Sequence, residues 1–229
     1  MRTLIVIPAY NEASNIMALV TGIRATFGGD VVVIDDGSED ATAAEARRAG
    51  AQVLQHSCNL GIGATVQTGF LYALAHGYDL VVRLDGDGQH DPSCIPQFLE
   101  LLSAGAADIV VGSRFLGRAG YQSTVVRRIG IVILSVISAL VGTRVTDPTS
   151  GYWGLNRRAL QLLARHQPDD YPETQGLVLA RRAGCRIREI PVVMQARSAG
   201  QSFLTGVLHS GFYMLKVVLA VLIERLRPR

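Results

Sequence analysis

Short apolar runs alternate with longer helical segments along most of this chain. The runs are rich in Val and Ile, and they end in turns that contain Pro, Gly, Asp or Asn. Parallel strands that are buried on both faces have this composition, and each needs a crossover, usually a helix, before the next parallel strand. The alternation therefore predicts a doubly wound, mainly parallel α/β sheet with helices on both faces.

The turns between the runs bound the expected elements. We expect strands at residues 3–7, 30–34, 51–55, 78–84, 108–111 and 187–194. The last strand should lie at an edge of the sheet, because Pro191 cannot donate a ladder hydrogen bond. We expect helices at residues 13–27, 39–49, 61–76, 92–103, 157–166 and 171–184, with Asn11 as the N-cap of the first.

The composition excludes several classes of protein. The chain has 229 residues, which is enough for one domain with a full core. Its net charge is only +3 and no Lys/Arg run interleaves with aromatic residues, so nucleic acid is not an expected partner. The cysteines, Cys58, Cys94 and Cys185, lack Cys-x-x-Cys spacing and indicate reduced thiols in the cytosol. The first apolar run stops at Pro8, too early for a signal peptide.

An acidic loop follows the strand expected at residues 78–84. Asp85 and Asp87 stand two residues apart, Gly86 between them allows a sharp turn, and Gln89 follows. Clustered oxygen ligands suit Mg2+ or Mn2+, and Mg2+ is usually held by one or two carboxylates plus substrate phosphates. In an open α/β sheet, ligands bind beyond the carboxyl ends of the strands, where this loop lies. The alternative is a solvated acidic turn.

A dinucleotide-binding fold is another way to use such a sheet, and the sequence argues against it. The Gly-x-Gly-x-x-Gly fingerprint would need a glycine five residues after Gly61, where this chain has Val66. The first strand also ends in Pro8-Ala9-Tyr10 and not in a Gly-rich turn. A nicotinamide or flavin enzyme is therefore not expected.

Two apolar segments in the second half of the chain bear on membrane contact. Residues 130–142 carry no charge and are flanked by Arg127, Arg128 and Arg144. This stretch is shorter than the about 20 residues that span a bilayer, so it predicts either a buried helix or a helix in the membrane interface. Residues 204–226 predict an amphipathic helix that binds a membrane surface or a partner, with a core helix of the domain as the alternative.

Five short motifs follow one another along the chain: Pro8-Ala9-Tyr10-Asn11-Glu12, Asp35-Asp36-Gly37-Ser38, Asn59-Leu60-Gly61, Asp85-Gly86-Asp87-Gly88-Gln89 and Thr149-Ser150-Gly151. Their order resembles that of the family 2 inverting glycosyltransferases of GT-A fold. More narrowly, it resembles the polyprenyl-phosphate sugar transferases, the group that includes dolichyl-phosphate mannose synthase. Residues 122–128, 146–151 and 170–173 also resemble a bacterial branch that is encoded beside small membrane proteins.

The resemblance implies that the first half of the chain binds a nucleoside-diphosphate sugar and a divalent metal. Mg2+ or Mn2+ would take up charge on the leaving diphosphate as the glycosidic bond breaks. Its implied ligands are Asp85, Asp87 and Gln89, and Asp87 is also implied to be catalytic. The implied nucleotide-sugar residues are Pro8, Ala9, Tyr10, Glu12, Asp35, Asp36, Gly61, Asp85 and Gly86.

Within this nucleotide-sugar group the resemblance implies different roles. Tyr10 would lie against the base, and Glu12 would accept a hydrogen bond from the base or the ribose. Asp35 or Asp36 would bond the edge of the base. The alternative for residues 35–38 is a strand-to-helix turn in which Asp36 or Ser38 is the N-cap.

The acceptor decides which further residues the reaction needs. A hydroxyl acceptor requires a general base, for which Asp147 and Glu173 are the candidates. A lipid phosphate, with a second pKa of about 6, is largely ionised at neutral pH and needs no base. It needs cations instead, and the fork of arginine suits phosphate oxygens. The expected acceptor residues are Arg114, Arg127, Arg128, Asp147, Ser150, Glu173 and Arg197, with Arg114 and Arg197 also expected to be catalytic.

The resemblance therefore implies a metal-dependent glycosyltransferase that works at the cytoplasmic face of the cell membrane. It would transfer a sugar to a polyprenyl phosphate such as undecaprenyl phosphate, for cell-envelope glycan synthesis. Residues 1–203 would form the GT-A domain, with donor and metal in residues 1–111 and the acceptor in residues 112–203. Residues 204–229 would form a helix that binds the membrane surface, a small membrane protein or a second copy of the chain.

Mannose synthases of this kind often carry a lysine where this chain has Phe203, so mannose is not assigned. A hydroxyl acceptor in polysaccharide synthesis is one alternative function. A non-catalytic assembly subunit that binds a nucleotide sugar is another.

Overall fold

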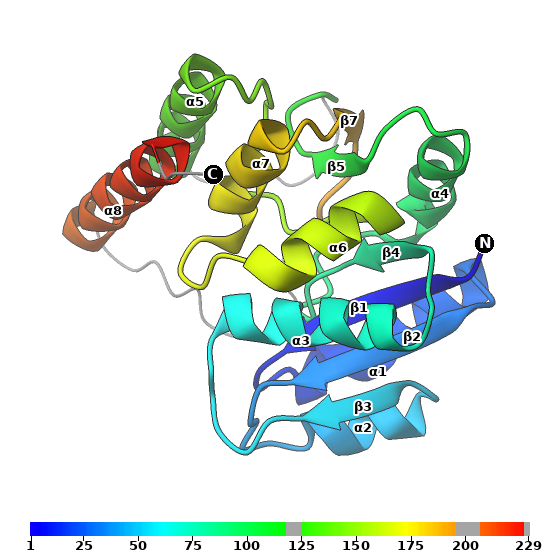
Figure 1. The fold of residues 1–229 in the computed structure, drawn as a ribbon. Helices are drawn as coiled ribbons and strands as arrows, with labels where there is room; N and C mark the ends of the chain where they lie inside the picture. Colours follow the sequence, from blue (N-terminus) through cyan, green and yellow to red (C-terminus); the bar gives the residue numbers. More distant parts are fainter. Residues whose placement is uncertain (118–124, 196–206, 227–229) are drawn as a thin grey trace.

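Seven strands form one sheet in the computed structural model, which describes residues 1–117, 125–195 and 207–226 (Figure 1). The strand order is β3-β2-β1-β4-β6-β5-β7. Neighbouring strands run parallel except at β6, which is antiparallel to both β4 and β5. The predicted mainly parallel α/β sheet is confirmed, and β7, which contains Pro191, lies at its edge as expected.

The observed elements agree with the predicted ones to within three residues at each boundary, wherever both exist in the first half of the chain. The strands are β1 (Thr3–Ala9), β2 (Asp30–Asp35), β3 (Gln52–Gln55), β4 (Leu80–Arg83), β5 (Ile109–Ser113), β6 (Trp153–Asn156) and β7 (Ile187–Pro191). The helices are α1 (Ala13–Thr26), α2 (Thr42–Arg48), α3 (Ile62–Ala75), α4 (Ile95–Ser103), α5 (Val125–Leu140), α6 (Arg157–His166), α7 (Pro172–Arg182) and α8 (Val207–Leu226). A short 3-10 helix, Pro92–Cys94, precedes α4.

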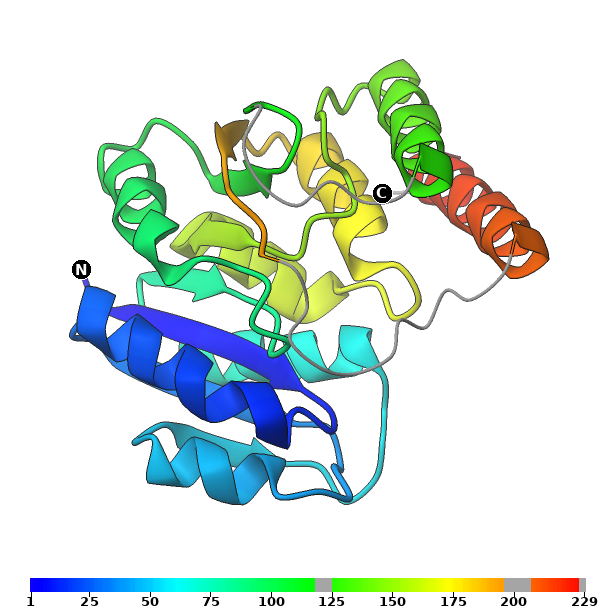
Figure 2. The same ribbon diagram turned by 180° about the vertical axis from the view of Figure 1, so that it is seen from behind.

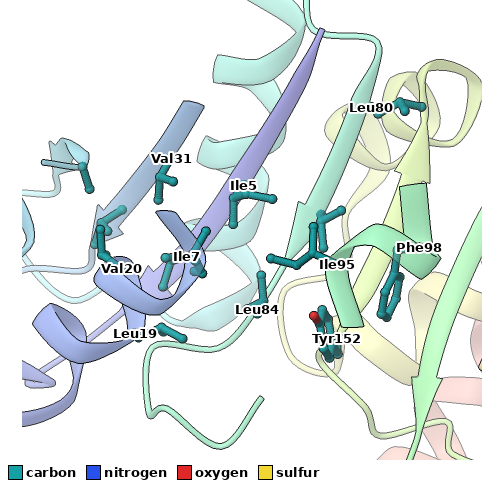
Figure 3. Packing of buried hydrophobic residues seen from close by; sticks show 14 of the residues in the cluster. Ile5, Ile7, Leu19, Val20, Val31, Leu80, Leu84, Ile95, Phe98 and Tyr152 are labelled. Carbon is teal, nitrogen blue, oxygen red and sulfur yellow. The ribbon is translucent and has the colours of Figure 1, made fainter. Parts of the chain in front are cut away.

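The side chains of β1 alternate between the two faces of the sheet. Ile5 and Ile7 belong to a buried cluster with residues of α1, α2 and α4, part of which is drawn in Figure 3. Leu4 and Val6 belong to a second cluster with residues of α3, α6 and α7. Because helices cover both faces, the strand is apolar at successive positions, which is the pattern seen in the sequence. The two layers of helices are seen from opposite sides in Figures 1 and 2.

Strand β6 was missed by the sequence analysis. It pairs Trp153 with Arg83 of β4 and with Val111 of β5, so it fills the space between those two strands. It has only four residues, one of which is Gly154, and it leads directly into α6. A strand this short carries almost no periodic signal, so only its pairing with distant strands identifies it.

Helices α5 and α8 lie side by side at one end of the molecule, next to α7 (Figures 1 and 2). Leu134 of α5, Val178 of α7, and Val217 and Val221 of α8 form a third, smaller buried cluster. Helix α8 is thus packed against α5 and α7. This packing agrees with the alternative expectation that residues 204–226 form a core helix of the domain. Within the described ranges, every helix is too short or too polar to cross a bilayer.

Asn11 does not cap α1, which corrects the expectation from sequence. Its backbone φ is 55°, in the left-handed region that asparagine tolerates better than most residues. Its Oδ1 accepts a hydrogen bond of 2.9 Å from the backbone N–H of Glu39. The N–H of Asn11 donates to the hydroxyl of Ser38 at 2.9 Å. Asn11 therefore joins the turn after β1 to the turn after β2.

Candidate functional site

A cavity of about 720 Å3 lies at the carboxyl ends of β1, β2 and β4. This is the end of a parallel sheet at which open α/β folds bind ligands. The structure brings ten of the predicted site residues onto its wall: Pro8, Ala9, Tyr10, Glu12, Asp36, Gly61, Asp85, Gly86, Asp87 and Glu173. The wall also contains four residues that were not predicted as site residues: Asn59, Ile62, Thr65 and Arg83.

Gly86 holds the acidic loop close to the end of β1. Its N–H donates to the carbonyl of Pro8 at 3.2 Å. A Cβ at this position would lie 3.0 Å from the carbonyl oxygen of Pro8 and 3.1 Å from the Cβ of Ala9. A larger residue would therefore require the loop that carries Asp85 and Asp87, or the end of β1, to shift by a few tenths of an ångström.

Asp36 lies on the cavity wall and organises the segment before α3. Its Oδ1 accepts from the N–H of Leu60 at 3.0 Å and lies 2.7 Å from Nδ1 of His56. Its Oδ2 accepts from the N–H of Gly61 at 2.9 Å. The other ring nitrogen of His56 lies 3.0 Å from the hydroxyl of Thr68 in α3. These bonds use three of the about four lone-pair positions of the carboxylate, so one is left for a ligand.

Asp35 is not among the residues of the cavity wall, and its place among the nucleotide-binding residues stays a prediction. Its side chain is fully buried, and its Oδ1 accepts from both the N–H and the hydroxyl of Ser38. Helix α2 begins only after Ala41, so neither Asp36 nor Ser38 is its N-cap. Residues 35–38 are therefore more than a capped turn, because they connect the cavity wall to the turn after β1.

Asp85 is held by two neighbours at the end of β4. Its Oδ1 accepts from Nη2 of Arg83 at 3.0 Å, and its Oδ2 lies 3.3 Å from Nε2 of His90. Removal of solvent would raise the pKa of this carboxyl, but the charge of Arg83 and the hydrogen bond from His90 hold the pKa well below its ordinary value. Asp85 is therefore an anion at neutral pH, and its side chain remains 34% exposed.

Arg83 bridges two parts of the wall that are far apart in the sequence. The same Nη2 that binds Asp85 donates to Oε1 of Glu173 at 2.6 Å. Glu173 is in the first turn of α7, after Pro172, where the helix dipole also favours a carboxylate. Burial would lower the pKa of Arg83, but the charges of Glu173 and Asp85 raise the pKa above its ordinary value.

Asp87 lines the cavity, whereas Gln89 does not. Oδ1 of Asp87 accepts from the N–H of Gln89 at 3.1 Å. The side-chain amide of Gln89 donates to the backbone carbonyl of Gln195 at 3.1 Å, and the backbone carbonyl of Gln89 accepts from the N–H of Gln195 at 2.9 Å. Gln89 therefore links the loop to the segment after β7, and its place among the metal ligands stays a prediction.

The charge of the wall suits a divalent cation. Among the described residues, five carboxylates line the cavity, from Glu12, Asp36, Asp85, Asp87 and Glu173, against one cationic side chain. A phosphate group that entered would meet this negative charge unless a cation stood between them. The described ranges contain no group of three or more His, Cys, Asp or Glu side chains that could hold a metal ion alone. Asp85 and Asp87 fit a Mg2+ or Mn2+ ion that also takes ligands from phosphate and water.

Gly151 lies directly against Asp85. A Cβ on Gly151 would be 2.4 Å from Oδ2 and 2.7 Å from Oδ1 of that carboxylate. Only a glycine allows the turn before β6 to approach so closely. The neighbouring Ser150 is buried, and its Oγ accepts from the N–H of Tyr152 at 3.3 Å, so it shapes this turn.

Arg114 and Asp147 form a buried ion pair that is not part of the cavity wall. The guanidinium donates from Nε to Oδ2 and from Nη2 to Oδ1 of Asp147. The hydroxyl of Thr149 donates to the same carboxylate at 3.2 Å, and the Asp147 side chain is fully buried. Glu189 of β7 accepts from the backbone N–H groups of Thr146 and Asp147, which fixes this turn. Asp147 is thus fully bonded and not placed as a general base.

Three predicted acceptor residues cannot be placed as side chains. Arg127 and Arg128 are in α5, but their side chains lie outside the described part of the structure. Arg197 lies outside the described residues altogether. Their roles in binding an acceptor stay predictions.

Arg83, on the cavity wall, and His56, which contacts Asp36, are site residues that were not predicted from the sequence. Arg83 had a usable signal, because it is a charged residue that follows Val81 and Val82 and precedes Asp85 by two positions. The two-residue period of a strand places residues 83 and 85 on the same side. His56 had no such signal, since a single histidine after a strand does not indicate a partner 20 residues away.

The comparisons with known proteins give a family model and named relatives that are all sugar transferases. The model of the family described as Glycosyl transferase family 2 matches residues 4–163. The chain is 32% identical over 217 residues to the undecaprenyl-phosphate mannosyltransferase of Micrococcus luteus, which covers 90% of this chain and 88% of that protein. It is 31% identical over 229 residues to the dolichyl-phosphate hexose transferase of Haloferax volcanii, covering 97% and 95% of the two chains.

A solved structure shares the fold. The glucosyl-3-phosphoglycerate synthase of Mycobacterium tuberculosis, crystallised with Mn2+, uridine diphosphate and phosphoglyceric acid, superposes with a TM-score of 0.73. The comparison covers 100% of this chain and 80% of that one at 22% sequence identity. Identity at this level supports a common fold and no more.

Proposed function

This chain belongs to glycosyl transferase family 2, and we propose that it transfers a sugar from a nucleoside-diphosphate donor to a polyprenyl phosphate in the presence of a divalent metal. It is a glycosyltransferase with the GT-A fold. The names of its bacterial and archaeal relatives state polyprenyl-phosphate acceptors, which supports the same acceptor class here. One observation carries the proposal: the carboxylates of Asp85 and Asp87 share a cavity wall with Tyr10, Glu12 and Asp36.

In this proposal the nucleotide occupies the part of the cavity between the ends of β1 and β2. Tyr10 provides an aromatic face for the base, and the remaining lone pair of Asp36 accepts from the edge of the base or from the ribose. Glu12, on the same wall, is nine-tenths buried, and its Oε2 accepts a hydrogen bond of 2.7 Å from the side-chain amide of Asn15. The proposed roles of Pro8, Ala9 and Gly61 are to form the wall against which the nucleotide lies.

Asp85 and Asp87 would hold the metal, Mg2+ or Mn2+. When bound, such an ion stabilises the negative charge that develops on the leaving diphosphate. The residues of this chain do the rest: Arg83 and His90 keep Asp85 ionised and fixed, and Gly86 keeps the loop against β1. The five carboxylates of the wall make the donor's binding depend on the cation, because the diphosphate is itself an anion.

The ion pairs of Asp147 and Glu173 favour a phosphate acceptor over a hydroxyl acceptor. A hydroxyl needs a general base, and Asp147 and Glu173 were the candidates. Asp147 is buried and paired with Arg114, and Glu173 is paired with Arg83 at 2.6 Å, so each would have to give up an ion pair to take a proton. A phosphate monoester is already an anion at neutral pH and attacks without a base.

A transfer assay tests the proposed function. The purified chain is incubated with undecaprenyl phosphate, Mn2+ or Mg2+ and a panel of radiolabelled UDP- and GDP-sugars, and the organic phase is counted. We expect one donor to give a lipid-soluble product that chelation of the metal abolishes. Asp87→Asn should remove this product, whereas Asp91→Asn should keep it. Asp91 is the matched control because it lies in the same loop, caps the 3-10 helix and does not line the cavity.

The other outcomes separate the alternatives. Metal-dependent hydrolysis of the donor without lipid product would contradict the phosphate acceptor and support a hydroxyl acceptor in polysaccharide synthesis. Tight binding of a nucleotide sugar without any turnover would contradict an enzyme and support an assembly subunit.

The second part of the proposal concerns the apolar surface of α5 and α8. Side chains of both helices remain exposed on the sides away from the third cluster: Val132, Ile133, Val136 and Leu140 of α5, and Leu219, Leu222, Ile223 and Leu226 of α8. Exposed cations accompany them at Arg144, Lys216 and Arg225. Apolar side chains together with cations fit an anionic lipid surface. The apolar side chains would enter the acyl boundary, and the cations would contact the negatively charged headgroups.

We therefore expect the α5–α8 surface to bind the cytoplasmic leaflet, where the polyprenyl phosphate would be presented. The free thiols of all three cysteines agree with a reducing compartment. The double variant Val136→Asp/Ile223→Asp should lose sedimentation with phosphatidylglycerol vesicles. Leu71→Asp on α3, which changes a side chain of similar exposure, should not. If the wild-type chain does not sediment with the vesicles, the proposal that the α5–α8 surface binds lipid is wrong. Equilibrium sedimentation would then test whether this surface binds a second copy of the chain.

A further inference from the structure

Arg83 is the one arginine on the described part of the cavity wall, and it is almost completely buried. It ends β4, a strand whose other residues are Leu80, Val81 and Val82. Burying a guanidinium costs free energy that only close, well-oriented partners offset. A hydrophobic residue at this position would fill the space without that cost, so the charge needs an explanation beyond packing.

The hydrogen bonds of Arg83 are unusual in their distribution. Nη2 alone serves both carboxylates, Asp85 at 3.0 Å and Glu173 at 2.6 Å. Nε and Nη1 are buried and have no hydrogen-bond partner in the described structure. If the sole role of the side chain were to neutralise two acids, its fork would be expected to use separate nitrogens for them. Its geometry instead draws the two carboxylates to one point.

The two carboxylates belong to different halves of the molecule. Asp85 starts the acidic loop after β4, and Glu173 is in the first turn of α7, 90 residues apart from Arg83 in the sequence. Val178 of α7 belongs to the third cluster together with residues of α5 and α8. Helix α7 therefore lies between the cavity wall and the two helices that carry the α5–α8 surface. Arg83 therefore links α7 directly to the acidic loop.

We propose that Arg83 is a positioning residue that fixes Asp85 for the divalent ion and couples it to α7 through Glu173. This inference rests on the proposed function, because it requires Asp85 to hold a metal. It assigns Glu173 to the support of the metal loop and not to proton transfer. Residues that orient a metal ligand commonly change metal affinity by about 10- to 100-fold when removed.

Binding of Mn2+ tests the proposal with a readout other than catalysis. Electron paramagnetic resonance of free Mn2+ gives the dissociation constant in the presence of UDP or GDP. We expect Arg83→Gln to raise this constant by about tenfold or more. Glu173→Gln, which leaves Arg83 paired with Asp85, should raise the dissociation constant of Mn2+ less than Arg83→Gln does. Arg83→Lys keeps the charge and should recover part of the affinity.

A charge-balanced double variant separates positioning from simple neutralisation. Arg83→Met/Glu173→Leu removes one charge of each sign and should restore the folded stability lost in Arg83→Gln, because buried ion pairs are often replaceable by apolar residues. If Arg83 positions Asp85, the double variant will fold but will not regain Mn2+ affinity. Recovery of wild-type affinity in the double variant would overturn the proposal, as would unchanged or tighter Mn2+ binding in Arg83→Gln. Absence of Mn2+ binding by the wild type would instead count against the proposed function.

Discussion

Arg114 and Asp147 are joined by two hydrogen bonds of 2.6 Å each, from Nε to Oδ2 and from Nη2 to Oδ1. Arg114 follows β5 and Asp147 lies in the turn before β6, so the pair fixes the place where the antiparallel strand enters the sheet. The backbone N–H of Arg114 also donates to Oδ2 at 3.2 Å. The pair thus stabilises the structure where β5 and β6 meet.

Removing one partner of this pair should be costly to stability. Asp147→Ala leaves the guanidinium of Arg114 largely buried without its counter-charge, and a loss of about 3–5 kcal/mol in the free energy of unfolding is expected. Urea denaturation followed by circular dichroism measures it. Asp147→Asn should lose less and should keep transfer activity at temperatures where it is folded. A folded Asp147→Asn without any activity would show that the carboxylate acts in the reaction after all.

Gly151→Ala should disable the metal loop without unfolding the protein. The new methyl group would sit 2.4 Å from Oδ2 of Asp85, so either the carboxylate or the turn must move. We expect kcat for sugar transfer to fall at least about tenfold, as a barrier increase of about 1.4 kcal/mol produces. Gly28→Ala is the control, because a Cβ there meets nothing within 4 Å. Equal activity of the two variants would show that Asp85 tolerates displacement.

His56→Ala should weaken nucleotide binding. The imidazole lies 2.7 Å from Oδ1 of Asp36 and 3.0 Å from the hydroxyl of Thr68, so it holds the carboxylate in place on the cavity wall. A hydrogen bond to a charged group contributes about 1.5–3 kcal/mol to stability. If about 1.4 kcal/mol of this positions Asp36 for the nucleotide, its loss raises Kd about tenfold. Calorimetric titration with UDP and GDP in the presence of Mg2+ measures the change. His76→Ala, at the end of α3 away from the cavity, should leave Kd unchanged.

Asp108, which directly precedes β5, should make the free energy of unfolding depend on pH. Burial would raise the pKa of this carboxyl, but hydrogen bonds from Arg186 and Asn156 lower the pKa to about 2, from an ordinary value of 3.8. Because the folded state holds the lower pKa, its contribution is present above pH 3.8 and is lost as pH falls through about 2. A difference of this size corresponds to about 2 kcal/mol at pH 7.

The matched variant for this prediction is Asp108→Asn. Denaturation of both proteins between pH 7 and pH 3 should show the wild type more stable by about 2 kcal/mol at neutral pH, with the difference shrinking as the pH falls below 3.8. A difference that stays constant across this range would mean that the lost stability does not come from ionisation of Asp108.

Local patterns in the sequence were sufficient for much of the architecture. The run of residues 3–9 is apolar because β1 is buried on both faces, and that burial is visible in the composition of the run. The acidic loop could be placed at the carboxyl edge because Asp85 and Asp87 directly follow a strand-like segment. Strand β6 could not be found in this way, since four residues with a central glycine have no period to detect.

The sequence by itself determined which segments are buried, where the chain turns and which loops carry carboxylates. It could not decide between Asp35 and Asp36, because only the packing of the turn buries the first and leaves the second on the cavity wall. Nor could it bring Arg83 to Glu173, or Asp147 to Arg114, because these contacts join segments that approach only when the sheet is assembled. Local propensity acts over a few residues, whereas the partner of a buried charge is chosen by the tertiary structure that removes both from water.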